Sequence, residues 1–198
     1  SLANTYRPYT FEDVIGQAHP VFTLKGALSK PSGTYLLQGP RGTGKTTLAR
    51  IFARIVNCQD PNTCTRSNQC VSCQCISENL KHPDIIEMNG AESRGIDEAR
   101  ALIAQTSTYP RFKYRVIIID EMHQLTTQAQ ECLLKPLEEP NKHTIWMLCT
   151  TNPDKLKPTI QSRAIKLNLT ILSNDEIKET VGRVALAESL TIPDVIMA

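Results

Sequence analysis

Short apolar runs alternate along this chain with longer segments of helical periodicity. Five of these runs are short, largely apolar and bounded by turn residues, and we predict them as strands at residues 34–38, 85–88, 115–120, 144–150 and 164–169. Three longer segments predict helices at residues 45–56, 96–106 and 128–139. Strands that read as continuous apolar runs are buried on both faces. The pattern therefore predicts an α/β fold, a parallel sheet with helices on both sides.

The pattern changes after residue 169. Ser173 is followed by Asn-Asp-Glu, which is typical of a helix N-cap and an acidic first turn, and the helix is expected to run to about Leu186. The residues after it are too few to build an independent core. We therefore predict a domain at residues 1–171 and the incomplete start of a helical lid domain at 172–198, within a truncated form of a longer protein.

Composition narrows the class of protein. The chain has 198 residues, of which 40% are hydrophobic and 21% charged, as in ordinary globular proteins. A net charge of +2 excludes binding to nucleic acid through bulk positive charge, so any DNA contact must be local. No apolar run approaches the roughly 20 residues of a membrane-spanning helix, and residues 1–10 lack a signal-peptide pattern. We predict a cytoplasmic location and no membrane partner.

The first predicted strand ends in Gly-Pro-Arg-Gly-Thr-Gly-Lys-Thr, residues 39–46, directly before a predicted helix. This is a phosphate-binding loop: backbone N–H groups surround the β-phosphate, Lys45 reaches the β- and γ-phosphate oxygens, and the Thr46 hydroxyl binds Mg²⁺. A glycine-rich turn that only links a strand to a helix is the alternative. The residues predicted here to bind ATP are Gly39, Arg41, Gly42, Thr43, Gly44, Lys45, Thr46 and Thr47.

A second motif supports this interpretation. The apolar run at residues 115–120 ends in Asp120 and Glu121. In ATPases with a phosphate-binding loop, such a strand supplies a carboxylate to Mg²⁺, and we assign this role to Asp120. Glu121 is the expected general base that polarises the attacking water. Solvated carboxylates at the end of a strand are the alternative, but they would not explain the neighbouring loop.

Further segments of the chain resemble one family. They are Tyr6-Arg7-Pro8 and residues 11–17, 82–88, 93–97, 120–125 and 133–140. Their order and spacing, over about residues 2–171, resemble the gamma/tau clamp-loader subunits of bacterial DNA polymerase III. The resemblance implies an AAA+ ATPase with a five-stranded parallel sheet. It implies a hetero- or homo-oligomeric ring of clamp-loader subunits that hydrolyses ATP, opens the sliding clamp and loads it on primer-template DNA. The alternative is a nucleotide-gated assembly protein that binds ATP without appreciable turnover.

The resemblance also implies roles for single residues. Thr151 takes the position of the γ-phosphate sensor, and Asn152 is the nearby polar alternative. Ser162-Arg163-Ala164 matches the element whose arginine reaches the ATP site of the neighbouring subunit, so Arg163 is the expected arginine finger. Ala164 replaces the usual cysteine, Asn89-Gly90 replaces an Asp-Ala pair, and Pro136 interrupts a helix that it should kink or shift. These departures indicate a divergent member.

Two contact surfaces follow from the same resemblance. Arg7, Val14 and Ile15 are expected to line the adenine pocket. Phosphates of primer-template DNA are expected near Arg94, with an ordinary solvated surface residue as the alternative. The further basic residues near the strand ends, for which the ordinary interpretation is favoured, are Arg111, Lys113 and Arg115.

Five of the seven cysteines lie between residues 58 and 75. In a reducing compartment such clustering indicates a metal site rather than disulfides. Cys70 and Cys73 have the C-x₂-C spacing that supplies two thiolates from one turn. The resembled family carries a four-cysteine zinc module here, which implies Zn²⁺ held by Cys58, Cys64, Cys70 and Cys73 in an insertion at residues 57–76. Cys75 is a spare or substitute ligand, and unpaired thiols or a disulfide are the alternatives.

Overall fold

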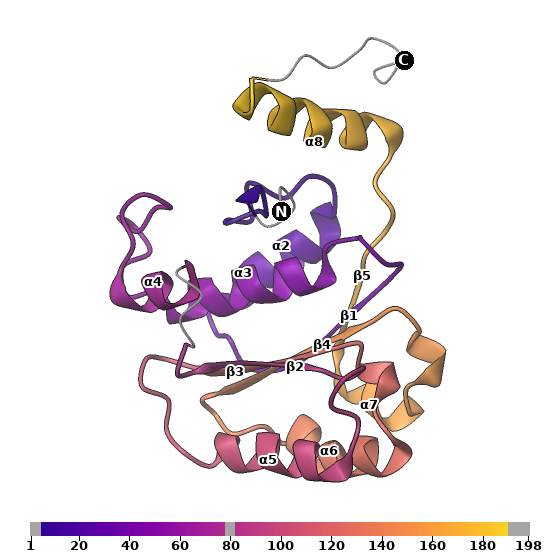
Figure 1. Cartoon of the computed structure of the whole chain (residues 1–198). Coiled ribbons are helices and arrows are strands. Elements are labelled where there is room, and N and C mark those ends of the chain that lie inside the picture. The colour runs from indigo at the N-terminus through magenta and orange to yellow at the C-terminus, as the bar shows by residue number, and fades with distance from the viewer. Residues whose placement is uncertain (1–4, 78–81, 190–198) are drawn as a thin grey trace.

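The computed structural model describes residues 5–77 and 82–189 and contains one five-stranded sheet (Figure 1). All neighbouring strands are parallel, in the order β2-β3-β4-β1-β5. The strands are β1 (Gly33–Gln38), β2 (Ile85–Asn89), β3 (Arg115–Asp120), β4 (Thr144–Thr150) and β5 (Ile165–Asn168). The predicted α/β fold with a five-stranded parallel sheet is confirmed.

Helices cover both faces of the sheet (Figure 1). One side carries α2 (Ala18–Ala27), α3 (Lys45–Asn57) and α4 (Val71–Ser77). The other side carries α5 (Ile96–Thr106), α6 (Thr127–Glu138) and α7 (Pro158–Arg163), together with the short 3₁₀ helices η1 (Met122–Gln124) and η2 (Pro153–Lys155). The last described helix, α8 (Asn174–Ala187), lies above the N-terminal segment, next to the α2 and α3 layer.

The alternating strand residues divide the core into two layers. Leu37 and Met147 pack on the α3 side, whereas Leu36 and Trp146 pack on the α5 and α6 side, and all four are fully buried. Because successive side chains of a strand point to opposite faces, a strand covered on both sides is apolar at every position. The largest buried groups, Phe52 against Tyr35 on one face and Trp146 on the other, anchor the two layers.

The predicted strands and helices lie within one or two residues of those observed. The sequence did not predict α2, α4 and α7, which are short or present no continuous apolar stripe. Helix α6 continues past Pro136 and ends two residues later at Glu138. Because Pro136 is in the last turn, its missing N–H removes one hydrogen bond, to the Cys132 carbonyl, without breaking the helix earlier.

Helix α8 begins where the sequence predicted it. Ser173 caps α8 as predicted, with its hydroxyl accepting from the Glu176 N–H, but residues 190–198 of the predicted lid lie outside the described residues, and the division at residue 171 stays a prediction. Along the described chain, none of the helices combines the length and apolar character needed to cross a membrane.

Candidate functional site

The strands β1, β3 and β4 end at the same edge of the sheet, and the predicted phosphate loop follows the first of them. Gly39 approaches the chain after β5 so closely that a Cβ atom there would lie 2.2 Å from the Leu169 carbonyl oxygen. Gly44, the N-cap of α3, has a φ angle of 94°, in the region that side chains disfavour. The glycines therefore set the shape of the loop, and the N-terminus of α3 directs its free N–H groups toward it.

Lys45 is buried within this loop, with 6% of its surface exposed. Its Nζ donates to the carbonyl oxygens of Gly39 and Pro40, at 2.8 and 2.6 Å. Burial lowers the pKa of Lys45, while Cys149, Glu121 and Asp120 act in the opposite direction. Phosphate oxygens would offer this ammonium group stronger partners than neutral carbonyls do, because ionic hydrogen bonds are roughly twice as strong.

Thr46, in the first turn of α3, contacts Asp120, the last residue of β3. The Thr46 hydroxyl donates to Asp120 Oδ2 at 2.8 Å, and Asp120 Oδ1 accepts from the Glu121 N–H at 2.9 Å. A hydroxyl and a carboxylate side by side are hard oxygen ligands of the kind that Mg²⁺ prefers beside phosphates. The two residues assigned to Mg²⁺ from the sequence therefore lie together and fit that ion.

Glu121 has an unusual backbone conformation that directs its side chain. Its φ and ψ angles are 47° and 44°, a left-handed conformation that non-glycine residues adopt rarely. Its carboxylate Oε2 accepts from the Thr151 hydroxyl at 3.0 Å and lies 3.4 Å from His123 Nδ1. His123 also lies 3.0 Å from the Thr150 hydroxyl. The predicted general base is thus held by the predicted sensor and by a buried histidine to which the sequence assigned no role.

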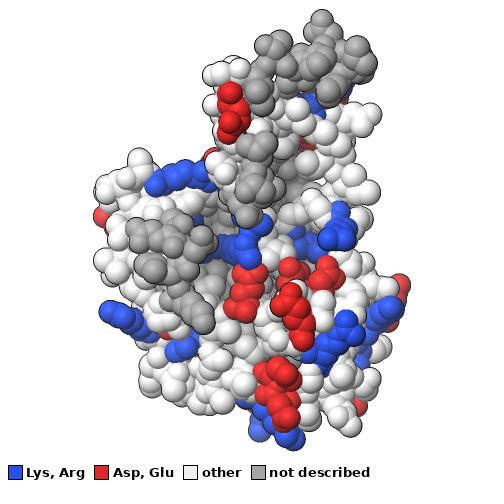
Figure 2. Space-filling view, in the orientation of Figure 1, with Lys and Arg blue, Asp and Glu red and all other residues white. Residues whose placement is uncertain are grey.

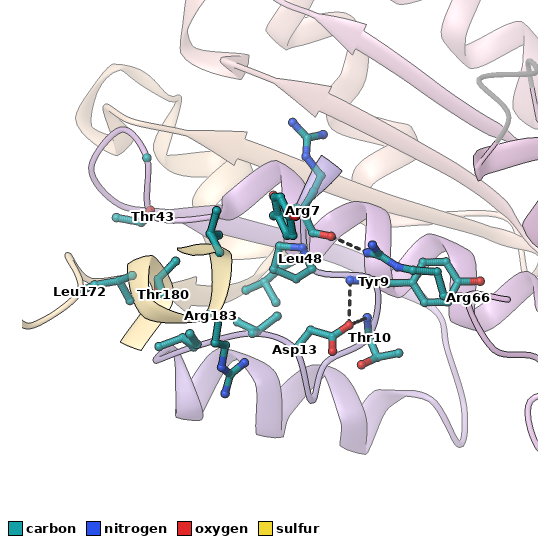
Figure 3. A pocket seen from close by; sticks show the side chains of 18 of the residues that line it. Arg7, Tyr9, Thr10, Asp13, Thr43, Leu48, Arg66, Leu172, Thr180 and Arg183 are labelled. Carbon is teal, nitrogen blue, oxygen red and sulfur yellow. Dashed lines mark hydrogen bonds between the residues drawn. The ribbon is translucent and has the colours of Figure 1, made fainter. Parts of the chain in front are cut away.

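A cavity of about 710 Å³ opens beside the loop, under α8 (Figure 3). Arg7, Val14 and Ile15, the residues assigned to the adenine pocket, all line it. Gly42, Gly44 and further loop residues line its other end. Tyr6, Pro8 and Asp13, which stand in the segments that carry the resemblance, also line the wall. The sequence did not predict the remaining wall residues, most of which come from segments distant along the chain: Tyr9, Thr10, Leu48, Cys64, Thr65, Arg66, Leu172, Thr180, Arg183 and Val184.

Two further predicted site residues lie outside this wall. Asn152 follows β4, and its N–H donates to the Thr150 hydroxyl at 3.1 Å. Arg163 ends α7, where its guanidinium donates to the Thr159 carbonyl and pairs with Glu138 Oε2 at 2.9 Å. Arg163 therefore does not reach the phosphate loop of its own chain.

The four predicted metal ligands come together. The Sγ atoms of Cys58, Cys64, Cys70 and Cys73 all lie within 4.8 Å of one another, and Cys75 is outside this group. Four thiolates about 2.3 Å from a tetrahedral zinc would be ~3.8 Å apart, and Cys58 and Cys70 are separated by 3.9 Å. The donor set and the spacing therefore fit Zn²⁺, and the four cysteines form no disulfide.

The backbone prepares one of these sulfurs for the charged state. Although burial raises the pKa of the Cys70 thiol, backbone hydrogen bonds from Gln59 and Cys73 and side-chain hydrogen bonds from Cys73 and Cys64 lower it to about 6. The Gln59 N–H points to the Cys70 sulfur at 3.5 Å, and the Cys70 N–H points to Cys64 at 3.4 Å. Burial raises the pKa of the Cys58 and Cys73 thiols. Metal binding requires deprotonated cysteines, so Cys70 is the thiol of this group that its surroundings prepare for a cation.

The basic residues considered for DNA contact differ in their surroundings. Arg115 is buried, lies 3.6 Å from Asp84 and donates to Pro83, which makes it a structural residue. Lys113 donates to the Cys58 carbonyl at 2.8 Å. Arg94 is exposed, although its Nε donates to the Ala91 carbonyl at 2.9 Å. On the face in Figure 2, acidic and basic side chains of the described residues are interspersed.

Comparisons with known proteins agree with this geometry. The sequence profile of the family described as "DNA polymerase III, delta subunit" matches residues 17–173. The chain is 40% identical over 197 residues to Bacillus subtilis DNA polymerase III subunit tau, covering 98% of this chain and 35% of that protein. It is 35% identical over 192 residues to the Escherichia coli tau subunit, covering 96% and 30%. The chain thus spans about a third of the length of these relatives.

A solved structure shows the same fold. The Thermotoga maritima RuvB Holliday junction branch migration motor matches with a TM-score of 0.70 at 25% identity, over 96% of this chain and 57% of that one. The fold is therefore that of the AAA+ ATPases with a phosphate-binding loop. Because the family profile covers most of the chain, the protein belongs to the DNA polymerase III delta-subunit family, and within it resembles the tau and gamma/tau subunits.

Proposed function

We propose that this chain is the nucleotide-binding part of a clamp-loader subunit that hydrolyses ATP, opens the sliding clamp and loads it on primed DNA. One observation carries the proposal: Lys45, the Thr46–Asp120 pair and Glu121 meet at the ends of β1 and β3, next to a cavity that can hold a nucleotide. The similarity to DNA polymerase III tau subunits supports the clamp-loading role.

Each residue at the loop has a distinct task in this proposal. Lys45 leaves the carbonyls of Gly39 and Pro40 and pairs with the β- and γ-phosphate oxygens. Thr46 and Asp120 would hold Mg²⁺, which offsets negative charge on the phosphates. Glu121 accepts a proton from the attacking water. Thr151, which now donates to Glu121, senses the γ-phosphate, with Asn152 as the nearby alternative.

Arg163 acts on the neighbouring subunit. In the single chain it is paired with Glu138, at the end of α7 and away from its own loop. An arginine finger supplied by a neighbour offsets the charge that develops on the transferred phosphoryl group. A monomer is therefore expected to bind ATP and hydrolyse it poorly, and the active unit is an oligomer of loader subunits.

The site at Cys58, Cys64, Cys70 and Cys73 is proposed to hold structural Zn²⁺. The four protein sulfurs would fill all four positions of a tetrahedral ion, which would leave none open for catalysis. The predicted cytoplasmic location agrees with four cysteines that form no disulfide.

A second candidate is a nucleotide-gated assembly protein that binds ATP without turnover. Glu121 held by Thr151 and Arg163 held by Glu138 favour it, because both hydrolytic groups have partners within the chain. The two candidates differ in turnover. ATPase activity of the longer protein that carries this chain, assembled with loader partners, should rise strongly when primed DNA and sliding clamp are added together. ATP binding with flat, negligible turnover would instead favour the assembly protein.

A further inference from the structure

The base end of the cavity shares a wall with the cysteine module, defined here as residues 57–76. Cys64, Thr65 and Arg66 line the cavity together with the N-terminal segment at residues 6–10 (Figure 3). One metal-ligating cysteine therefore lies in the wall of the proposed nucleotide site. A structural metal far from the site would leave nucleotide affinity unaffected, whereas this arrangement places the two sites side by side.

The cysteine module holds the backbone of the N-terminal segment. Arg66 donates from Nη1 to the Thr5 carbonyl at 3.3 Å and from Nη2 to the Arg7 carbonyl at 2.8 Å. Gln69 donates to the Tyr9 hydroxyl at 3.1 Å. Residues 7–9 adopt neither helix nor strand, so they depend on such side-chain contacts for their position.

Arg54 also joins the cysteine module to the N-terminal segment. Its guanidinium lies 3.8 Å from the centre of the Tyr9 ring, and its Nη2 donates to the Tyr9 carbonyl at 2.7 Å. Its Nη1 donates to the sulfur of Cys73 at 3.8 Å. Arg54 is buried, with 6% exposed, so one guanidinium contacts a metal ligand on one side and the cavity wall on the other.

The position of Arg66 depends on how Cys64 is held. The chain between Cys58 and Cys70 contains no helix or strand, and Arg66 follows Cys64 by two residues. An ion that ties Cys64 to the other three sulfurs closes this stretch into two short loops and restricts the positions that Arg66 can take. Without the ion, the stretch gains conformational freedom, and the hydrogen bonds from Arg66 to the N-terminal segment are weakened.

We propose that the cysteine module is a positioning element for the nucleotide site, so that metal occupancy and nucleotide affinity are linked through Arg54, Arg66 and Tyr9. This inference rests on the proposed nucleotide site. Coupling between two binding sites is reciprocal: if the metal raises nucleotide affinity about tenfold, nucleotide raises metal affinity by the same factor. Arg54 and Arg66 are positioning residues in this scheme, because they act through the segment that contacts the base.

The test uses this chain with its metal content measured by elemental analysis. The affinity for a fluorescent ATP analogue is titrated for the parent, for Arg66→Ala and for the control Arg100→Ala, which replaces an exposed arginine on α5. Release of metal to a colorimetric chelator is followed with and without ATP. Arg66→Ala is the main variant because Arg66 is exposed and is not a metal ligand, so the variant should fold and retain its metal.

We expect one zinc per chain in all three proteins. Nucleotide affinity should fall about 5- to 10-fold in Arg66→Ala alone, and ATP should slow metal release from the parent and the control but not from Arg66→Ala. Parent affinity in Arg66→Ala, or metal release from the parent that ATP does not change, would overturn the inference while leaving the proposed function intact. A parent chain that binds no nucleotide would overturn both, and a parent chain without metal would overturn the linkage alone.

Discussion

The two ends of the candidate site are built in different ways. The phosphate end consists of one continuous segment, residues 39–47, and two acids at the end of β3. The base end is assembled from four separate segments: the N-terminal residues 6–15, Leu48 on α3, the cysteine module and α8 with the chain before it. The geometry of a continuous motif is set by its own residues. The geometry of a wall built from separate segments depends on how each segment is held in place. Changes at the phosphate end should therefore alter chemistry, and changes at the base end should alter affinity.

The largest effect is expected from Arg163→Ala, which removes the proposed arginine finger of the neighbouring site. Turnover of the assembled oligomer should fall by about 10³- to 10⁵-fold, because the finger offsets transition-state charge, while ATP affinity changes little. Steady-state ATPase assays and ATP-analogue titrations measure the two quantities. The exposed Arg100→Ala variant is the matched control, and equal losses in both variants would contradict the assignment.

Glu121→Gln should lower turnover by about 10²- to 10⁴-fold, because the amide cannot accept the proton of the attacking water. Nucleotide binding should be retained, since the loop and Thr46–Asp120 are untouched. Single-turnover hydrolysis in the assembled loader measures the effect, with the exposed Glu92→Gln variant as control. Undiminished hydrolysis would exclude Glu121 as the general base.

Lys45→Ala should weaken ATP binding by about 100-fold or more, which corresponds to about 2.7 kcal/mol. The buried ammonium group is the proposed partner of the β- and γ-phosphate oxygens, and alanine would leave the carbonyls of Gly39 and Pro40 without the Lys45 donor. Titration with a fluorescent ATP analogue measures the affinity, and the exposed Lys30→Ala variant should bind ATP like the parent. Near-parent affinity in Lys45→Ala would place the nucleotide elsewhere.

Val14→Thr tests the base end with a change that keeps the shape of the side chain. A hydroxyl without a partner in an apolar wall costs about 1–2 kcal/mol, so the affinity for ATP should fall about 5- to 30-fold. Turnover at saturating ATP should not change. Val181→Thr, on a more exposed position of α8 outside the cavity wall, is the control. A fall in saturated turnover would contradict the division between the two ends.

The smallest effect is a pH dependence of stability at His82, beside the cysteine module. Its Nδ1 accepts from the Asp84 N–H and its Nε2 lies 3.0 Å from the Ser72 hydroxyl, so the ring is neutral. Burial lowers the pKa of His82 below its ordinary value of 6.5, partly opposed by Asp84. Below pH 6.5 the unfolded chain then binds more protons than the folded one, and the free energy of unfolding decreases as the pH falls through the folded-state pKa.

Urea unfolding at pH 7.5 and 5.5 measures this decrease. It should be smaller in His82→Gln than in the parent, and the exposed His19→Gln variant should behave like the parent. Acid also weakens the binding of metal by thiolates, but that effect is common to all three proteins. An identical decrease in His82→Gln would show that other groups account for it.

Sequence and fold contribute different information on the family. The fold is shared with the RuvB motor at a TM-score of 0.70, so the arrangement of strands does not separate a DNA polymerase III subunit from a branch migration motor. The amino-acid sequence does separate them, because identity is 40% to a tau subunit over nearly the whole chain and 25% to the motor. Sheet packing tolerates many apolar sequences, whereas a loop that contacts a nucleotide or a partner tolerates few.

The sequence by itself determined the five-stranded sheet, the predicted phosphate loop, the two acids after β3 and the C-x₂-C pair Cys70 and Cys73. Each of these follows from a continuous pattern, because strand burial, tight turns and C-x₂-C spacing are local properties. The resemblance to a known family, rather than spacing, added Cys58 and Cys64 to that pair. Tertiary structure decided the rest. Thr151 and His123 hold Glu121, and Arg54 contacts Tyr9 from 45 positions away. Such contacts form only when the folded chain brings the side chains within a few ångströms of one another. The spacing of residues along the chain therefore does not predict them.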